Sequence, residues 1–96
     1  MSSERIVTVV PEAGLHARPA AKFVETVNEH ESDVQIGHAD EDNLTSAGSM
    51  IAVTSLGVGT GEDVRIVADG PDEDATLDAL EEVLSTPENE LADADT

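Results

Sequence analysis

A histidine and an arginine stand two residues apart where a helix is expected to begin. His16 and Arg18 lie within residues 13–21, and apolar residues recur at helical spacing from about residue 17 onward. A Ser, Thr, Asp or Asn normally caps a helix by accepting from its free N–H groups, whereas here His16 holds that position. Arg18 follows in the first turn, where the positive end of the helix dipole disfavours a cation. The pattern therefore favours a bound anion, such as phosphate, held by the N–H groups and the guanidinium.

The imidazole of His16 would be a suitable nucleophile at such a position. The positive end of a helix disfavours the imidazolium form, so we expect a neutral ring near neutral pH. A phosphoryl group on the ring would introduce an anion that the same field stabilises, and a reactive P–N bond suits transfer rather than storage. The alternative is a surface histidine beside an incidental helix start, and spacing alone leaves both interpretations open.

The elements that must position this site alternate between short strands and helices. β-branched and alternating apolar residues predict strands at 5–10, 32–39, 43–45 and 63–69. Helical spacing and start signals predict helices at 17–29, at 49–55 with Ser49 as the cap, and after Gly70-Pro71. The order β-α-β-β-α-β-α predicts an α+β fold in which helices cover one face of a single sheet. We expect one domain at residues 1–86 and a disordered acidic tail at residues 87–96.

Composition excludes several classes of function. The 96 residues include 22 Asp and Glu against 4 Lys and Arg, a net charge of −18 that argues against nucleic-acid and membrane-surface partners. The chain has no cysteine, which excludes disulfides and thiol nucleophiles, and its one aromatic residue, Phe23, cannot form a stacking platform. No apolar run approaches the ~20 residues of a spanning helix and the start is not basic, so we expect a cytoplasmic protein.

The acids are spread along the chain rather than gathered in blocks. Two explanations are adaptation to a cytoplasm of molar salt and an acidic surface for a basic partner. Charges repel over ~30 Å at 0.01 M salt but over only ~3 Å at 1 M. Dispersed charge favours adaptation to salt, because an interaction tail would concentrate it. The segment from Ala13 to Lys22 contains no Asp or Glu, so the proposed phosphate site is locally positive.

The segment around the histidine also resembles a known family. Gly14-Leu15-His16-Ala17-Arg18-Pro19-Ala20 is similar to the active-site signature of HPr, the histidine-containing phosphocarrier family of the phosphoenolpyruvate-dependent sugar phosphotransferase system. The segment from Ser49 to Gly57 resembles the family's serine segment, and Asp78 to Glu81 resembles part of its last helix. The resemblance implies an open-faced β-sandwich, with a four-stranded antiparallel sheet covered on one face by three helices.

The resemblance also implies roles for individual residues. His16 corresponds to the histidine that Enzyme I phosphorylates on Nδ1 and that passes the phosphoryl group to a IIA domain for uptake of a sugar such as fructose. Arg18, with Ala17, corresponds to the part of the motif that binds the phosphate. Such a carrier is a monomer that needs no cofactor or metal, and it is a phosphotransfer component rather than an independent enzyme.

Ser49 matches the family's regulatory serine, which a dedicated kinase phosphorylates in some lineages. A phosphate there would add about −1.5 to −2 charge beside the partner-binding surface. Capping of the short helix is the alternative role of this serine. Because family members bind partners near the histidine, Leu15, Met50 and Ile51 are candidates for an exposed apolar docking patch, although some of them must instead belong to the core.

Three other functions remain as alternatives to sugar uptake. The carrier could serve a dihydroxyacetone kinase, a choice that depends on the downstream partner. It could be a regulatory binding protein controlled through Ser49, although binding alone would not require a nucleophile. It could also be an acidic decoy for basic proteins.

His30 and His38 lie at no metal-ligand spacing and are expected on the surface. The glycine-rich residues 57–61 lack the Lys of a phosphate-binding P-loop and predict a turn.

Overall fold

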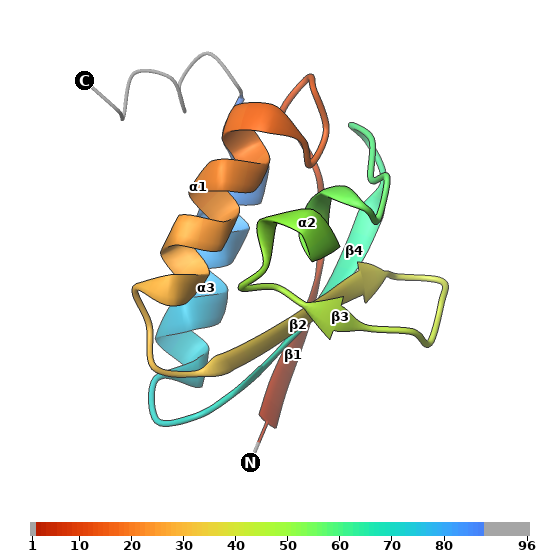
Figure 1. Cartoon of the computed structure of the whole chain (residues 1–96). Coiled ribbons are helices and arrows are strands. Elements are labelled where there is room, and N and C mark those ends of the chain that lie inside the picture. Colours follow the sequence, from red (N-terminus) through yellow and green to blue (C-terminus); the bar gives the residue numbers. More distant parts are fainter. Residues whose placement is uncertain (1, 88–96) are drawn as a thin grey trace, which may run out of the picture.

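The structure is a computed structural model, and it describes residues 2–87. The strands are β1 (Ser2–Thr8), β2 (Asp33–His38), β3 (Thr45–Ser46) and β4 (Asp63–Asp69), and the helices are α1 (Ala17–Asn28), α2 (Met50–Thr54) and α3 (Glu73–Ser85). The strands form one antiparallel sheet in the order β1-β4-β2-β3. The three helices cover one face of this sheet (Figure 1).

This arrangement confirms the predicted α+β fold, its element order and its four-stranded sheet under three helices. Several strand boundaries differ from the prediction, since β1 ends at Thr8 rather than at residue 10, β2 spans 33–38 rather than 32–39, and β3 spans 45–46 rather than 43–45. β1 begins at Ser2 rather than Arg5, because Ser2 pairs with Asp69 at the far end of β4 and the partner strand sets the length. The expected acidic tail at residues 87–96 lies outside the described residues except for Pro87.

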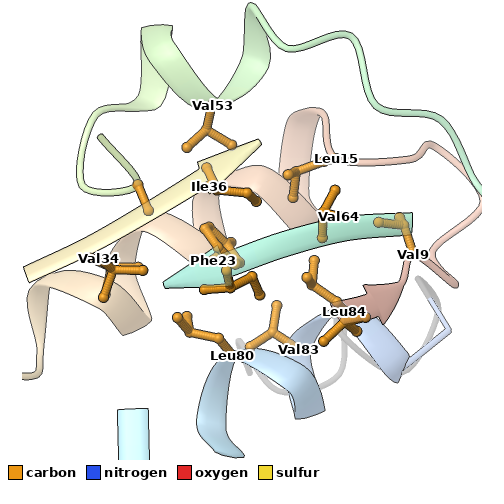
Figure 2. Close-up of a cluster of buried hydrophobic side chains, with 14 of the residues drawn as sticks. Val9, Leu15, Phe23, Val34, Ile36, Val53, Val64, Leu80, Val83 and Leu84 are labelled. Carbon is orange, nitrogen blue, oxygen red and sulfur yellow. The ribbon is translucent and has the colours of Figure 1, made fainter. Parts of the chain in front are cut away.

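Alternation along the strands separates a buried face from an open face. In β4, Val64, Ile66 and Ala68 are buried under the helices, whereas Asp63 and Asp69 are exposed. Burying a side chain such as Val or Ile stabilises a fold by about 1.5–3 kcal/mol, so this period of two fixes which face the helices cover. The core is aliphatic around one phenylalanine (Figure 2), and its largest fully buried side chains are Phe23, Leu15, Ile36, Ile66, Leu77, Leu80 and Leu84.

The N-terminus of α1 and the C-terminus of α3 lie at the same end of the molecule (Figure 1). The main-chain N–H of Val10, just beyond β1, donates to the carbonyl oxygen of Leu84 at 2.8 Å. The segment that joins β1 to α1 is therefore held between the sheet and the end of α3. No helix within residues 2–87 is both long and apolar enough to cross a membrane.

Asp72 links the start of α3 to the connection between α1 and β2. It directly precedes the first turn of α3, at the N-cap position of that helix. Its carboxylate accepts from the hydroxyl of Ser32 and from the main-chain N–H groups of Glu31 and Ser32, at 3.1 and 3.0 Å. These hydrogen bonds lower the pKa of Asp72 to about 2, and the hydrogen bond from Ser32 Oγ is the largest cause.

Candidate functional site

His16 holds the N-cap position of α1, as the sequence predicts. Its backbone is extended, with φ −137° and ψ 166°, and its half-buried side chain makes no capping hydrogen bond. An ordinary cap residue would turn its side-chain oxygen toward the N–H groups of the first turn. Within residues 2–87 the imidazole makes no such hydrogen bond, so this helix start lacks the usual stabilising cap.

The first turn of α1 is open to an anion. The main-chain N–H groups of Ala17 and Arg18 form no hydrogen bond with other residues of the described range, and the turn contains no acidic side chain. The carbonyl of His16 accepts from the N–H of Ala20 at 3.4 Å, so the helical hydrogen bonds begin only there. Free N–H groups and the positive end of the helix dipole together favour negative charge beside His16.

The backbone at Ala17 adopts an unusual conformation. Its φ is +51°, in the left-handed region that a non-glycine residue seldom enters, at a cost of about 1–2 kcal/mol. Leu15 on one side and Pro19 on the other are both buried, so packing holds the backbone at both ends of this short segment. Such strain persists only where the surrounding structure fixes it, and it gathers at functional sites.

The turn before His16 rests on a second loop, which follows α2. Gly14 has φ +72°, and a Cβ there would lie 2.5 Å from the carbonyl oxygen of Val58 and 2.8 Å from Cα of Gly59. The N–H of Leu15 donates to that same carbonyl oxygen at 2.9 Å. Only glycine allows the two backbones to approach this closely. Residues 57–61, which the sequence predicts as a simple turn, therefore support the segment that precedes His16.

Arg18 is exposed and free of ion pairs within residues 2–87. The contrast with Arg5 is informative, because Arg5 contacts the carboxylates of Asp78 and Glu81 at 2.7 and 2.9 Å. In a chain with 22 acids, a guanidinium without a carboxylate partner remains available to a phosphate.

Two of the three predicted docking residues are exposed, as a docking surface requires. Met50 and Ile51 are exposed, Ile51 to 79%, and both lie on α2, which packs beside α1 (Figure 1). The prediction for Leu15 is wrong, because its side chain is completely buried and belongs to the hydrophobic core (Figure 2). Leu15 instead fixes the residue before His16.

Ser49 caps α2, as the sequence predicts. Its Oγ accepts from the main-chain N–H of Ala52 at 3.3 Å, and its side chain is half-buried.

The other two histidines, His30 and His38, are partly exposed, and each also makes a contact with the main chain. Each is half-buried and contacts a main-chain carbonyl oxygen at 2.7 Å, His30 that of Thr26 and His38 that of Leu56. Among the described residues, no group of three His, Asp or Glu side chains is placed to hold a metal ion.

Comparison with known proteins agrees with this geometry. A family model described as the PTS HPr component phosphorylation site matches residues 3–86. The chain belongs to the HPr family. Phosphocarrier protein HPr of Haloferax volcanii is 68% identical over 85 residues, which cover 88% of this chain and 96% of that protein. This HPr-family chain is thus a phosphocarrier of the phosphotransferase system.

Solved HPr structures share the fold. The HPr of Bacillus anthracis superimposes with a TM-score of 0.80 at 32% identity, covering 86% of this chain and 96% of that one. A Thermoanaerobacter tengcongensis HPr gives 0.79 at 33% identity, covering 85% and 90%. The open-faced sandwich expected for the HPr family is therefore confirmed.

The sequence did not predict the residues whose backbone supports the segment before His16. Val58 and Gly59 lie far from His16 along the chain, and no periodicity connects them to it. The one signal was Gly14, because a glycine beside a candidate active residue can mark a left-handed backbone or a close approach.

Proposed function

We propose that the chain accepts a phosphoryl group on Nδ1 of His16 from phosphorylated Enzyme I and passes it to a IIA domain. The observation that carries this proposal is the open N-terminus of α1, where two N–H groups that have no partner among residues 2–87 lie beside an imidazole that makes no capping hydrogen bond. The membership of the HPr family supports the same assignment.

The transfer moves the phosphoryl group from Enzyme I to the imidazole. A lone pair on Nδ1 of His16 attacks phosphorus while the bond between phosphorus and the donor atom of Enzyme I breaks, and the donor atom keeps that electron pair. The N–H groups of Ala17 and Arg18 and the Arg18 guanidinium supply donors and positive charge for the three phosphoryl oxygens. In the second transfer His16 is the leaving group, so the site must hold the phosphoryl group without making its bond inert.

Docking of the partner proteins involves Met50 and Ile51. Both are large apolar side chains exposed on α2, beside the helix that begins directly after His16. Apolar contact suits a carrier that acts in a salty cytoplasm, because molar salt screens charge steering. The many exposed acidic side chains then adapt the protein to a solvent of high salt. The protein acts as a monomer.

Ser49 is proposed as a regulatory phosphorylation site next to this docking surface. It directly precedes Met50, so a phosphate on its Oγ would place charge beside the apolar contact. Transfer by Ser49→Asp at a rate equal to that of Ser49→Ala would reject the regulatory role, because aspartate retains the capping oxygen and adds charge.

The test is reconstitution of both transfer steps. The chain is incubated with radiolabelled phosphoenolpyruvate and the Enzyme I of its source organism, and then with a IIA domain of that organism. We expect acid-labile, base-stable label on the wild type and on His30→Asn, and none on His16→Ala. Label that persists in His16→Ala, while that variant remains folded, would reject the assignment.

A further inference from the structure

His38, at the end of β2, forms a hydrogen bond that plays no part in the transfer chemistry at His16. Its Nε2 lies 2.7 Å from the carbonyl oxygen of Leu56, just beyond the C-terminus of α2. A carbonyl oxygen can only accept, so Nε2 carries the hydrogen and donates it. The histidine is half-buried and Leu56 packs against the core, so the bond joins the sheet to a partly buried backbone.

α2 has few other attachments to the rest of the fold. The helix is five residues long, and Val53 is its one buried side chain. Before the helix, Nδ2 of Asn28 donates to the carbonyl oxygen of Gly48 across a longer 3.4 Å. After the helix, the hydrogen bond from His38 to the carbonyl oxygen of Leu56 is shorter, at 2.7 Å. A helix this short is held mainly by such tertiary contacts, because its own hydrogen bonds contribute little.

The same bond lies next to the loop that supports His16. The chain turns at Gly57, with φ +67°, and the carbonyl oxygen of Val58 then accepts from the N–H of Leu15 at 2.9 Å. His38 therefore holds the backbone between the helix that carries Met50 and Ile51 and the loop that supports the residue before His16.

We propose that His38 is a positioning residue for phosphotransfer. It fixes α2, which carries Met50 and Ile51, relative to the segment that precedes His16. The proposal rests on the function assigned above to His16. Loss of the imidazole leaves the Leu56 carbonyl without its donor, so residues 55–58 shift. Partner proteins then meet a displaced α2, and the turn before His16 loses part of its support.

The test compares three variants at histidines with similar environments. His38→Ala removes the donor, and His38→Gln places an amide N–H near the position of Nε2. His30→Ala is the matched control, since His30 is also half-buried and also contacts a carbonyl oxygen at 2.7 Å, but at the opposite end of α1 from His16. For each variant the KM and kcat for transfer from Enzyme I are measured, together with amide hydrogen exchange.

We expect His38→Ala to raise the KM roughly fivefold, the factor that corresponds to one lost hydrogen bond. Exchange of the Leu15, Ser55 and Leu56 amides should accelerate relative to amides in the centre of β4, whereas a general loss of stability would accelerate all of them. His38→Gln should restore both quantities towards wild type, and His30→Ala should change neither.

An unchanged KM and unchanged relative exchange in His38→Ala would overturn the proposal, as would an equal effect of His30→Ala. If His38→Ala does not fold, His38→Asn replaces it, because the shorter amide does not reach Leu56. If the wild type is never phosphorylated on His16, the proposed function fails. The exchange data then still decide whether His38 fixes the loop, and normal exchange at Leu15 in the variant would reject that role.

Discussion

The main-chain N–H of Leu15 donates to the carbonyl oxygen of Val58 at 2.9 Å, which joins the segment before His16 to the loop after α2. The proposed phosphorylation site is thus assembled from two loops that are distant in sequence. Its chemistry lies in one short motif, whereas its rigidity depends on a backbone contact outside that motif.

Replacement of Gly14 should damage both the fold and the site. Gly14→Ala places a Cβ 2.5 Å from the Val58 oxygen in a residue with φ +72°, so the loops must separate. We expect a loss of about 3 kcal/mol in the free energy of unfolding, from left-handed strain plus overpacking. Urea denaturation measures this loss.

Gly61→Ala is the control for that substitution. Gly61 also has a positive φ, of +85°, but a Cβ there would point into open space, with no atom beyond its chain neighbours within 4 Å. It should lose only the conformational part, about 1–2 kcal/mol. Equal losses in the two variants would show that the contact between the loops contributes nothing.

A charge on α2 should impair partner docking without weakening the fold. Ile51 is 79% exposed, so Ile51→Glu should change the free energy of unfolding by no more than about 0.5 kcal/mol. If the side chain is a docking contact, the KM for transfer should rise by about tenfold, which corresponds to about 1.4 kcal/mol.

Ile6→Glu offers a matched control for this docking test. Ile6 is 52% exposed, but it lies on β1 and faces the open side of the sheet, away from the helices. Steady-state transfer from Enzyme I should distinguish the two variants. A similar rise in KM for Ile6→Glu would point to a general effect of added negative charge.

Local patterns were sufficient to predict the elements and the centre of the site. Strand alternation in residues 63–69, the helical spacing after residue 17 and the cap at Ser49 each depend on nearby residues. The position of His16 at the start of α1 follows from the same kind of signal. These features could be predicted because their physical causes lie within one or two turns of chain.

Long-range contacts could not be predicted in the same way. Leu15 lies in a loop with no periodicity, so the sequence could not show that its side chain enters the core rather than the docking surface. The bond from His38 to Leu56 and those from Glu31 and Ser32 to Asp72 join segments that meet only after the sheet has formed.

The carboxylate of Asp72 should make stability depend on pH. Its pKa of about 2 is below the ordinary value of 3.8, so the folded state favours the ionised form. This contribution is complete well above pH 4 and is lost as the pH falls through 4 towards 2. Asp72→Asn should therefore be less stable than wild type at pH 6, and the difference should shrink at pH 2–3.

Urea denaturation of both proteins between pH 2 and pH 7, at constant molar salt, measures that difference. Glu41→Gln is a suitable control, because Glu41 is exposed in the turn after β2. A gap between Asp72→Asn and wild type that stays constant across the whole range would contradict the role assigned to the ionised carboxylate.

The net charge of −18 predicts that stability increases with salt. Repulsion among the acids extends over ~30 Å at 0.01 M salt but only ~3 Å at 1 M, so desalting should expand or unfold the chain. Circular dichroism and the hydrodynamic radius between 0.01 M and 3 M KCl check this expectation. A fully native spectrum with an unchanged radius at 0.01 M would count against adaptation to salt.

The most direct test of the central claim is to identify the phosphorylated atom. The chain, labelled with ¹⁵N, is incubated with phosphoenolpyruvate and Enzyme I, and the imidazole nitrogens of all three histidines are observed by NMR. We predict coupling to ³¹P at Nδ1 of His16 alone, with unchanged signals from His30 and His38. Phosphate on another residue, or none on this chain while Enzyme I itself is phosphorylated, would contradict it.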